Sequence, residues 1–489
     1  MNENTPLPEI DKLLNQAQEA FIAFKRATFA ERAALMHRVA DHIEALGPGL
    51  IDTARAETNL PEARLVGEKA RTVFQWRLYA DALASGKVLD VRIDTADPTR
   101  TPPKPDIRKT YVGLGVIAVF GASNFPFAFS TAGGDTASAI AAGCSVIVKT
   151  HPGHPKTSAM MADAIKAAIQ QAGWHPGLFA EVRSDNIEGG QYLVAHPLVK
   201  AVGFTGSFTG GKALFDLAAT RKEPIPVFAE MGSVNPVFLL PGKLAAAPAD
   251  TARQYTASLT LGVGQFCTNP GILVLPEAGS SAFLDALREA VTGTPAAPML
   301  HTGIAAAYIK NRKTLLSQEG VAVLAEAAEA DPESHGNAVV ATVSAKQFLA
   351  NEHLAHEVFG PFGLIVTYGT PEEVEAIAKT LSGQLTTTVL AEPEDLQQYH
   401  ELVALLTDKC GRLLLNGFPT GVEVCHAMQH GGPYPASTDS RFTSVGPDAI
   451  RRFARPLSYQ NWPDEFLPDE LKNANPLGIL RTVNGELTK

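Results

Sequence analysis

The stretch VIAVFGASNFPFAFSTAGGDTASAIAAGCSVIVK, residues 116–149, predicts a strand, a helix and a second strand in direct succession. Its two ends, VIAVF and CSVIVK, are short apolar runs of the kind that form buried strands. The small residues of STAGGDTASAIAAG between them favour a closely packed helix. This order is typical of a parallel sheet with helices on both faces, in which ligands bind at the carboxyl ends of the strands.

The alternation of helices and strands continues along most of the chain. Up to residue 230, helices are predicted at 156–173 and 210–219, and strands at 178–182, 200–207 and 224–230. A second alternating run after about residue 240 predicts a second α/β domain, with strands at 271–276, 362–369, 385–392 and 411–417. Residues 8–86 have helical spacing, and 88–115 predict two strands joined by a long connection. The predicted fold class is α/β.

Composition and charge exclude several classes of protein. A chain of 489 residues is too long for one core, and 45% hydrophobic with 19% charged residues is a folded composition. A net charge of −10 without a basic stripe argues against nucleic-acid binding. The N-terminus lacks the basic and apolar segments of a signal peptide, and the most apolar stretch is interrupted by Gly, Ser, Asn and Pro. We expect a cytoplasmic enzyme with no membrane partner.

Cysteine usage points to a single reactive thiol. None of the four cysteines is at CxxC spacing, which predicts neither a disulfide scaffold nor a zinc site. Cys267 lies in GQFCTNPG at 264–271, a glycine- and proline-flanked stretch typical of a loop. A loop thiol near backbone amides and a carboxylate base can act as a nucleophile. The alternative is a small buried hydrophobe, which is our interpretation of Cys144, Cys410 and Cys425.

Two polar residues follow apolar strands and are candidates for the same chemistry. The amide of Asn124, in GASNFPF at 121–127, could donate to an oxyanion, or the residue could be a simple turn asparagine. Glu230, at the end of VFAE, could be a general base with a raised pKa, or a solvated carboxylate. The turn FTGSFTGG at 204–211 could place pyrophosphate at a helix N-terminus, although it lacks GxGxxG spacing.

The order of these features resembles the aldehyde dehydrogenase family over nearly the whole chain. The resemblance rests on Asn124, Lys149, FTGS, FAEMG, Cys267 and HEVFGPF at 356–362. It implies a Rossmann-type cofactor domain at 1–87 and 114–229 and an α/β catalytic domain at 230–445. It also implies a β-ribbon oligomerisation arm at 88–113 with a C-terminal extension at 446–489, and therefore a homodimer or homotetramer.

The resemblance implies a role for each catalytic candidate. Cys267 would attack the aldehyde carbon, while the Asn124 amide and the backbone N–H of Cys267 would hold the oxyanion. Glu230 would activate water to hydrolyse the resulting thioester, and is also a candidate to deprotonate Cys267. No metal is implied.

Five further residues are implied to bind a nicotinamide cofactor. Lys149 would hold the adenosine ribose and Glu357 the nicotinamide ribose; the alternative for both is ordinary surface charge. Gly206 and Ser207 would lie beside the pyrophosphate, and Phe359 beside the nicotinamide. NAD-preferring relatives often carry a glutamate three residues after the lysine, where this chain has Pro152. With no carboxylate to repel a 2′-phosphate, we expect NADP to be preferred over NAD. Lys149 would favour it, and His151 or His154 is a further candidate for the same role.

Longer segments are similar to one branch of the family. FGASNFPFAFSTAGGDTASAIAAGCSVIVKTHPGHPKTS, STDSRFTSVGPDAIRRFARPLSYQN and the long tail resemble the branch with α-ketoglutaric semialdehyde (2,5-dioxopentanoate) dehydrogenases and a bacterial NADP-dependent fatty aldehyde dehydrogenase. Oxidation of 2,5-dioxopentanoate to 2-oxoglutarate is the first expectation, and oxidation of a long-chain aldehyde is the alternative.

A substrate that carries a carboxylate needs a cation or amide donors in its tunnel. Arg441 and the hydroxyls of Ser437, Thr438 and Ser440 are candidates, although Arg441 could equally be a structural arginine. The tunnel is expected to be lined by aromatic side chains, namely Phe125, Phe127, Phe266 and Phe418, which would suit a fatty aldehyde as well.

Two rival functions are disfavoured by the same residues. A CoA-acylating relative would use the cysteine but usually lacks the glutamate base, whereas Glu230 is present. A scaffold that had lost its activity would be expected to lack Cys267 or Asn124, and both are present.

Overall fold

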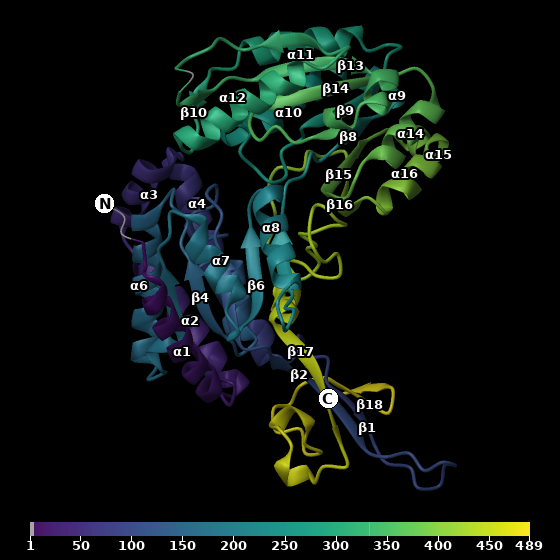
Figure 1. Cartoon of the computed structure of the whole chain (residues 1–489). Helices are drawn as coiled ribbons and strands as arrows, with labels where there is room; N and C mark the ends of the chain where they lie inside the picture. The colour runs from purple at the N-terminus through teal and green to yellow at the C-terminus, as the bar shows by residue number, and fades with distance from the viewer. Residues whose placement is uncertain (1–3, 332) are drawn as a thin grey trace.

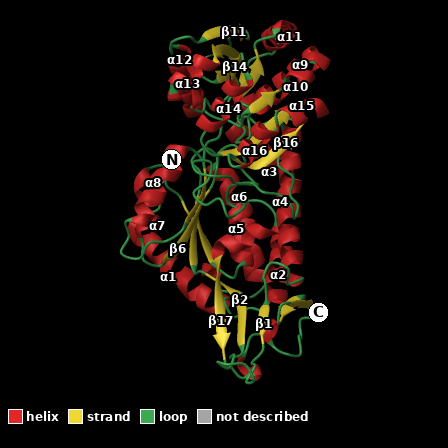
Figure 2. Cartoon of the chain, turned by 90° about the vertical axis from the view of Figure 1, so that its right-hand side faces the viewer, coloured by secondary structure: helices red, strands yellow, loops and turns green. Residues whose placement is uncertain are grey.

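The computed structural model describes residues 4–331 and 333–489. Two α/β units, each built on a largely parallel sheet, are accompanied by a separate ribbon of strands (Figure 1). Helices flank the strands of both units (Figure 2). The predicted α/β class, with two such domains and an edge ribbon, is confirmed.

The first sheet contains the stretch that opened the sequence analysis. Its strand order is β5-β4-β3-β6-β7 and every neighbouring pair is parallel. The strands are β3 (Val116–Phe120), β4 (Ser145–Lys149), β5 (Phe179–Val182), β6 (Val199–Thr205) and β7 (Val227–Glu230). Because all are parallel, their carboxyl ends meet at one edge, which brings together the segments that follow Phe120, Lys149, Thr205 and Glu230.

Both faces of this sheet are covered, which explains why every residue of β3 is buried. Ile117 and Val119 pack into the core on one face, and Val116, Ala118 and Phe120 into the core on the other. The helices of this unit are α1 (Leu7–Phe24), α2 (Phe29–Ala45), α3 (Pro48–Thr58), α4 (Glu62–Ala84), α5 (Gly134–Ala141), α6 (Pro155–Gln171), α7 (Ile187–Ala195) and α8 (Phe208–Ala219).

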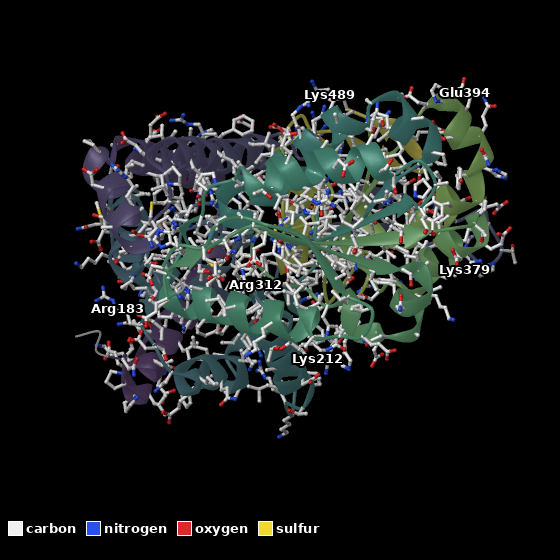
Figure 3. All side chains as sticks on the ribbon, turned by 90° about the horizontal axis from the view of Figure 1, so that it is seen from above. Arg183, Lys212, Arg312, Lys379, Glu394 and Lys489 are labelled. Carbon is white, nitrogen blue, oxygen red and sulfur yellow. The ribbon has the colours of Figure 1, made fainter. Side chains whose placement is uncertain are left out.

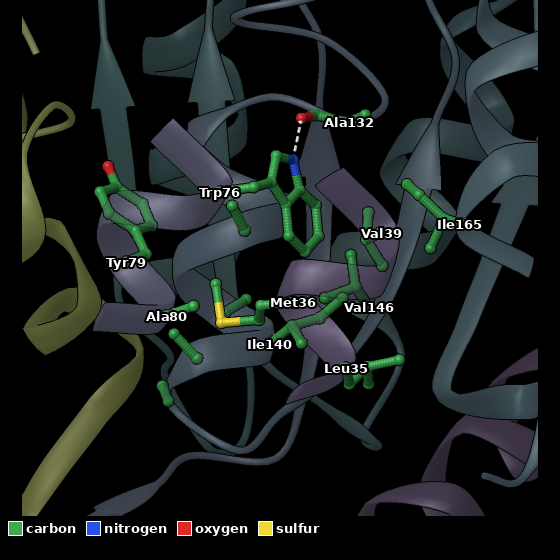
Figure 4. Packing of buried hydrophobic residues seen from close by; sticks show 14 of the residues in the cluster. Leu35, Met36, Val39, Trp76, Tyr79, Ala80, Ala132, Ile140, Val146 and Ile165 are labelled. Atoms are coloured by element: carbon green, nitrogen blue, oxygen red, sulfur yellow. Dashed lines mark hydrogen bonds between the residues drawn. The ribbon is translucent and has the colours of Figure 1, made fainter. Parts of the chain in front are cut away.

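Helix α4 is anchored in this core by Trp76. The indole Nε1 donates to the carbonyl of Ala132 at 2.8 Å, and the ring lies among apolar side chains of α2 and α5, including Met36, Val39 and Ile140 (Figure 4). A buried tryptophan combines a large apolar contact with one satisfied N–H. The axis of α4 is thereby fixed against the loop that follows β3.

The second sheet has seven strands in the order β11-β13-β14-β9-β8-β15-β16. Only the edge strand β11 is antiparallel to its neighbour among the described pairs. The strands are β8 (Val237–Leu239), β9 (Ile272–Pro276), β11 (Ala322–Glu326), β13 (Val339–Ser344), β14 (Phe362–Tyr368), β15 (Gln384–Leu390) and β16 (Cys410–Leu415). Four of them were predicted from the sequence; β8, β11 and β13 were not.

Helices also cover this second sheet. They are α9 (Pro241–Ala246), α10 (Pro248–Thr260), α11 (Ser281–Thr292), α12 (Thr302–Leu316), α13 (Ala345–Ala350), α14 (Pro371–Thr380), α15 (Pro393–Gln398) and α16 (His400–Thr407). A two-stranded pair, β10 (Ala297–Pro298) and β12 (His335–Gly336), lies beside them.

The ribbon is a five-stranded sheet in the order β17-β2-β1-β18-β19. The two strands predicted within 88–115 are present as β1 (Arg92–Asp94) and β2 (Ile107–Gly113). The C-terminal tail, expected only as an extension, supplies β17 (Ala454–Gln460), β18 (Arg481–Val483) and β19 (Glu486–Thr488). β17 pairs with β2 along its whole length, so the tail completes the ribbon.

Charged side chains lie at the periphery of the molecule. Seen from above, Arg183, Lys379 and Glu394 are at its rim (Figure 3). Within the described residues, no helix combines the length and apolarity needed to cross a bilayer.

Candidate active site

The loop that carries Cys267 has an unusual backbone. After α10, Gly262, Val263 and Gly264 all have left-handed φ angles, of 55°, 58° and 64°. Glycine accepts this conformation freely, whereas the β-branched Val263 is strained. A Cβ on Gly264 would collide with the carbonyl of Gly360, so the glycine permits the close approach of two loops. The Cys267 loop therefore packs directly on the loop that contains Glu357.

Asn235 fixes the position of Cys267 from the other side. Its side-chain Nδ2 donates to the carbonyls of Cys267 and Asn269, both at 2.9 Å. Its own backbone N–H donates to Oε1 of Gln384 at 3.1 Å. The sequence analysis did not select Asn235, which supports the loop from behind and does not face the substrate.

Cys267 is half-buried and lies beside two other reactive groups. Its Sγ is 3.6 Å from Nε2 of His430, and this Nε2 is 2.9 Å from Oε1 of Glu230. The ring N–H does not point along a hydrogen bond to Oε1, so the contact is electrostatic. Ser444 Oγ donates to the other carboxylate oxygen of Glu230 at 2.8 Å. The thiol, imidazole and carboxylate atoms all lie within 4.8 Å of one another.

The surroundings set opposite protonation states for the thiol and the carboxyl. Burial raises the pKa of Cys267 well above its usual value, and the neighbouring Glu230 charge raises it further. Burial also tends to raise the pKa of Glu230, but the neighbouring His430 and the hydrogen bond from Ser444 outweigh it and lower that pKa. Both interpretations of Glu230 from the sequence, a raised pKa and a solvated carboxylate, were therefore wrong, because the carboxylate is buried and stabilised by these two partners. At neutral pH the site therefore pairs a protonated thiol with a charged carboxylate that can accept its proton.

Asn124 lies next to the Cys267 loop. Its Nδ2 donates one hydrogen to the carbonyl of Gln265 at 3.1 Å, which leaves the second amide hydrogen for a ligand. Its backbone carbonyl accepts from Nη2 of Arg64 at 2.6 Å. The backbone N–H of Cys267 has no hydrogen-bond partner among residues 4–331 and 333–489. Two N–H donors are thus available for an oxyanion.

Cys267 opens onto a cavity of about 250 Å³. Two of the aromatic residues expected to line the tunnel, Phe125 and Phe266, are on its wall, together with Phe129. The expectation for the other two was wrong. Phe127 is fully buried in the core of the first domain, and the ring of Phe418 packs against Tyr255, 6.0 Å between centroids.

The predicted substrate cation is also wrong. The side chain of Arg441 is 80% exposed and forms an ion pair with Asp439, so it does not reach the cavity. The hydroxyls named with it are not free either: Ser437 donates to the carbonyl of Gly432 at 2.5 Å, and Thr438 donates to the carbonyl of Val227. Ser440 is exposed. The cations that line the cavity are instead Arg64 and Arg71 of α4.

The expected cofactor residues gather at the carboxyl edge of the first sheet and on the facing loop. Lys149 ends β4, while Gly206 and Ser207 connect β6 to α8. Ser207 Oγ caps α8 by accepting from Gly210 N at 3.2 Å. The N–H groups of Phe208 and Thr209 have no partner within the described chain, as an anion-binding helix N-terminus requires.

Lys149 also fits a negatively charged cofactor. It is half-buried, burial lowers its pKa, and within the described residues its ammonium forms no ion pair. Together with the free N–H groups of α8 on the same sheet edge, Lys149 would hold the negatively charged phosphates of a dinucleotide at that edge. The residues therefore suit the nicotinamide cofactor that the sequence implies.

Two histidines near Lys149 do not add charge to this site. His154 is fully buried, with Nε2 at 3.0 Å from the carbonyl of Ala122 and Nδ1 at 3.1 Å from Ser158 Oγ. Burial lowers its pKa, and lowers that of His151 well below the usual value. Burial thus favours the neutral form of both rings, so neither adds a fixed positive charge beside Lys149.

Glu357 and Phe359 lie in the loop before β14, which packs on the Cys267 loop. The carboxyl of Glu357 is folded against Gly232, where a Cβ would collide with its Oε2. Burial raises the pKa of Glu357 to about 7. Its charge is one of the groups that raise the pKa of Cys267.

Sequence comparisons agree with this arrangement. Residues 4–454 match the sequence model of the aldehyde dehydrogenase family. The chain is 47% identical to alpha-ketoglutaric semialdehyde dehydrogenase 2 of Azospirillum brasilense, covering 98% of this chain and 91% of the relative. It is 45% identical to alpha-ketoglutaric semialdehyde dehydrogenase of Acinetobacter baylyi, covering 99% and 92%.

Solved structures support the fold. A 1-pyrroline-5-carboxylate dehydrogenase superposes with a TM-score of 0.77 at 20% identity, covering 94% of this chain and 86% of that one. PnpE from Pseudomonas sp. WBC-3 superposes with a TM-score of 0.78 at 20% identity, covering 94% and 90%.

Proposed function

Because the chain belongs to the aldehyde dehydrogenase family, and is therefore an NAD(P)-dependent oxidoreductase that acts on aldehydes, we propose that its substrate is 2,5-dioxopentanoate. The product would be 2-oxoglutarate. The observation that carries the proposal is the convergence of Cys267, Glu230 and Asn124 at a cavity lined by two arginines. The two relatives of 45–47% identity, both named as alpha-ketoglutaric semialdehyde dehydrogenases, support the same substrate.

The first step forms a bond between Cys267 and the substrate. Sγ attacks the aldehyde carbon while the thiol proton passes to the Glu230 carboxylate, with His430 3.6 Å from Sγ and 2.9 Å from Oε1. The carbonyl oxygen becomes an oxyanion, which accepts hydrogen bonds from Asn124 Nδ2 and the N–H of Cys267. The product of this step is a thiohemiacetal.

The second half of the reaction releases the acid. Bound across the sheet edge, the oxidised nicotinamide supplies the acceptor for the hydride that leaves the substrate carbon. Lys149, Gly206, Ser207 and Glu357 would orient it, and Phe359 would flank the ring. What remains on Cys267 is a thioester. Once Glu230 has passed the thiol proton to solvent, its carboxylate removes a proton from the water that hydrolyses the thioester, and that proton returns to the departing Cys267 thiolate.

NADP is the proposed preferred cofactor. Pro152 stands where a carboxylate would repel a 2′-phosphate, and Lys149 supplies a positive charge on the same strand end. Because His151 and His154 are neutral, the preference rests on Lys149 and on the absence of a carboxylate at residue 152.

The most direct test of the substrate is a comparison of kcat/KM for 2,5-dioxopentanoate and for a long-chain aldehyde such as dodecanal. We expect the dioxo acid to be preferred by at least about 10²-fold, since each charge-assisted hydrogen bond to its carboxylate contributes roughly tenfold or more. The same assay with NADP and NAD is expected to give the higher kcat/KM with NADP. A preference for the long-chain aldehyde would assign the chain to the alternative substrate with unchanged catalytic residues.

We also propose a function for each domain of the chain and a homo-oligomeric assembly. Residues 1–87 and 114–229 would bind the cofactor, 230–445 would carry the nucleophile, and 88–113 with 446–489 would join subunits. Large apolar side chains exposed at a sheet edge and on the ribbon support this, namely Leu413, Leu415 and Leu487. Four unpaired cysteines support a reducing, cytoplasmic location.

The assembly predicts a molar mass of two or four chains. Contact with a second subunit would cover the exposed apolar edge residues of β16. We expect the burial of this surface to keep the subunits associated at micromolar concentration. Light scattering on the purified protein measures this directly. A molar mass of one chain, 51.8 kDa, would refute the homo-oligomer.

A further inference from the structure

Two arginines of α4 face the same cavity as the nucleophile. Arg64 and Arg71 are about two helical turns apart, roughly 10.5 Å along the axis, so both lie on one face of the helix. Both line the cavity of about 250 Å³ that Cys267 opens onto. A cavity of this size suits a small substrate rather than a drug-sized ligand, for which about 300–1,000 Å³ is usual.

The guanidinium groups have buried N–H donors with nothing to bind. Nη1 and Nη2 of Arg71 are both inaccessible to solvent and lack a hydrogen-bond partner in the described part of the chain. Arg64 donates from Nη2 to the carbonyl of Asn124 at 2.6 Å, and its Nη1 is likewise buried and unpaired there. Buried charged donors are costly unless they are paired. An acceptor bound in the cavity beside the two guanidinium groups would offset that cost for the three donor atoms.

The one carboxylate on this face of α4 does not fill that role. Glu68 lies between the two arginines, and its Oε1 accepts from the backbone N–H groups of Phe127 and Ala128 at 2.8 and 2.9 Å. Its Oε2 has no hydrogen-bond partner within the described residues, so it makes no direct bond to either guanidinium. Glu68 holds the loop after β3, and the cavity wall keeps a net positive charge.

Aromatic rings hold the guanidinium groups in place. The guanidinium carbon of Arg64 is 4.8 Å from the ring centroid of Phe125 and 4.6 Å from that of Phe266. That of Arg71 is 5.1 Å from the centroid of Phe129. Cation–π contacts of this kind orient a guanidinium without using its N–H donors. The donors are therefore positioned before any ligand arrives.

The terminal nitrogens of a third arginine near the site are already bonded, whereas its buried Nε has no partner among the described residues. Arg412 donates from Nη2 to the carbonyl of Pro419 at 2.9 Å, and from both terminal nitrogens to the carbonyl of Gly421 at 3.2 Å. It supports the loop that brings Gly421 and Val422 to the cavity wall. Among these three arginines, the unpaired terminal nitrogens in the described chain are those of Arg64 and Arg71.

We propose that Arg71 and Arg64 form the subsite for the carboxylate end of the substrate. Arg71 donates two parallel N–H bonds to the carboxylate, and Nη1 of Arg64 donates a third to the same 2-oxo acid group. The aldehyde at the other end of the molecule then faces Cys267 across the cavity. This inference rests on the proposed function, because it requires an aldehyde that carries a distal anion. A long alkyl chain would leave both guanidinium groups buried and unpaired.

The test compares an acidic and a neutral aldehyde of the same chain length. kcat/KM is measured with saturating NADP for 2,5-dioxopentanoate and for pentanal, in the wild type, Arg71→Met, Arg64→Met and Arg77→Met. Arg77 is a control on the same helix, because it pairs with Asp41 and Glu44 on the outer surface. Arg71→Met is expected to lose about 10²-fold and Arg64→Met about tenfold for the dioxo acid only. Arg77→Met should leave both substrates unchanged.

Glutarate gives a second readout that does not depend on turnover. This dicarboxylate is expected to protect Cys267 from iodoacetamide in the wild type and in Arg77→Met, and to fail to do so in Arg71→Met. Retained protection in Arg71→Met would overturn the subsite. If Arg71→Met does not fold, Arg71→Lys serves in its place, because it keeps the charge but cannot donate two parallel bonds. Unchanged selectivity in Arg71→Lys would likewise overturn the proposal.

The two assays separate failure of the subsite from failure of the proposed function. If the wild type prefers the dioxo acid but Arg71→Met slows both aldehydes equally, the function stands and the subsite is wrong. If the wild type has the same kcat/KM for pentanal as for the dioxo acid, the proposed substrate is wrong. Glutarate protection alone then decides the subsite. Loss of that protection in Arg71→Met would still support it.

Discussion

Replacing Cys267 with alanine is expected to lower kcat/KM for aldehyde oxidation by at least about 10⁴-fold, since loss of a covalent nucleophile removes the whole pathway. The polar neighbours of its Sγ, His430 at 3.6 Å and the carboxylate of Glu230, belong to the catalytic site and do not hold the fold together. The loop itself is fixed through the carbonyl of Cys267, which Asn235 binds at 2.9 Å. Binding of NADPH and the melting temperature should therefore stay close to those of the wild type.

A second cysteine provides the control for this variant. Cys410, in β16, is also half-buried, but its Sγ faces the carbonyl of Leu406 at 3.4 Å and lies outside the cavity. Cys410→Ala should keep kcat/KM within about twofold, as substitutions away from the site usually do. NADPH fluorescence measures cofactor binding in both variants. Activity that survives in Cys267→Ala would contradict the covalent mechanism.

Replacing Glu230 with glutamine is expected to reduce steady-state turnover by about 10²–10⁴-fold, the usual contribution of a general base. The change keeps the shape of the side chain and an acceptor for Ser444 Oγ, which donates to it at 2.8 Å. Loss of the carboxylate charge also removes one of the groups that raise the pKa of Cys267, so the thiolate forms at lower pH. Solvent can then take the thiol proton in place of Glu230, so the thioester should still form rapidly, whereas its hydrolysis, which needs the base, should be slow.

Rapid mixing distinguishes this step from the first one. We expect Glu230→Gln to release about one equivalent of NADPH per site in a fast burst, followed by slow turnover, as for other covalent intermediates that accumulate. Hydroxylamine, which attacks thioesters without a protein base, should accelerate the slow phase. The same reagent should have no effect on Cys267→Ala. Steady-state turnover equal to the wild type would show that Glu230 is not the base.

The catalytic candidates were predictable because each follows a clear local pattern. β3 is continuously apolar and Asn124 follows its end by four residues, while β7 is apolar up to its last residue, Glu230, so the sequence alone located both residues at or just after strand ends. Cys267 was recognisable from the glycines and proline around it. Parallel strands then bring such positions to one edge, as the structure shows for the first sheet.

The residues that were missed depend on contacts between distant segments. His430 is 163 residues from Cys267 along the chain and lies in an irregular region with no periodic pattern. Arg64 and Arg71 belong to a helix with mixed charge, where arginines usually face solvent. Which face of α4 meets the cavity is decided by the packing of Trp76 against the loop after β3. Local sequence patterns contain none of this information.

The wrong expectations have the same origin. Phe127 and Phe125 are two residues apart, yet the backbone N–H of Phe127 is bound by Glu68 and its ring turns into the core. Arg441 is in a segment whose motif resembles the family, but its guanidinium pairs locally with Asp439 at the surface. A resemblance locates a segment, whereas the direction of a side chain depends on the partners available around it.

Mass spectrometry of the acyl-enzyme tests the central claim most directly. Glu230→Gln is mixed with 2,5-dioxopentanoate and NADP, quenched in acid within the burst, and digested. The account predicts one acyl group per chain, on the peptide that contains Cys267, and none when NADP is omitted. NADPH formation without this adduct, or an adduct on Cys144, Cys410 or Cys425 instead, would contradict it.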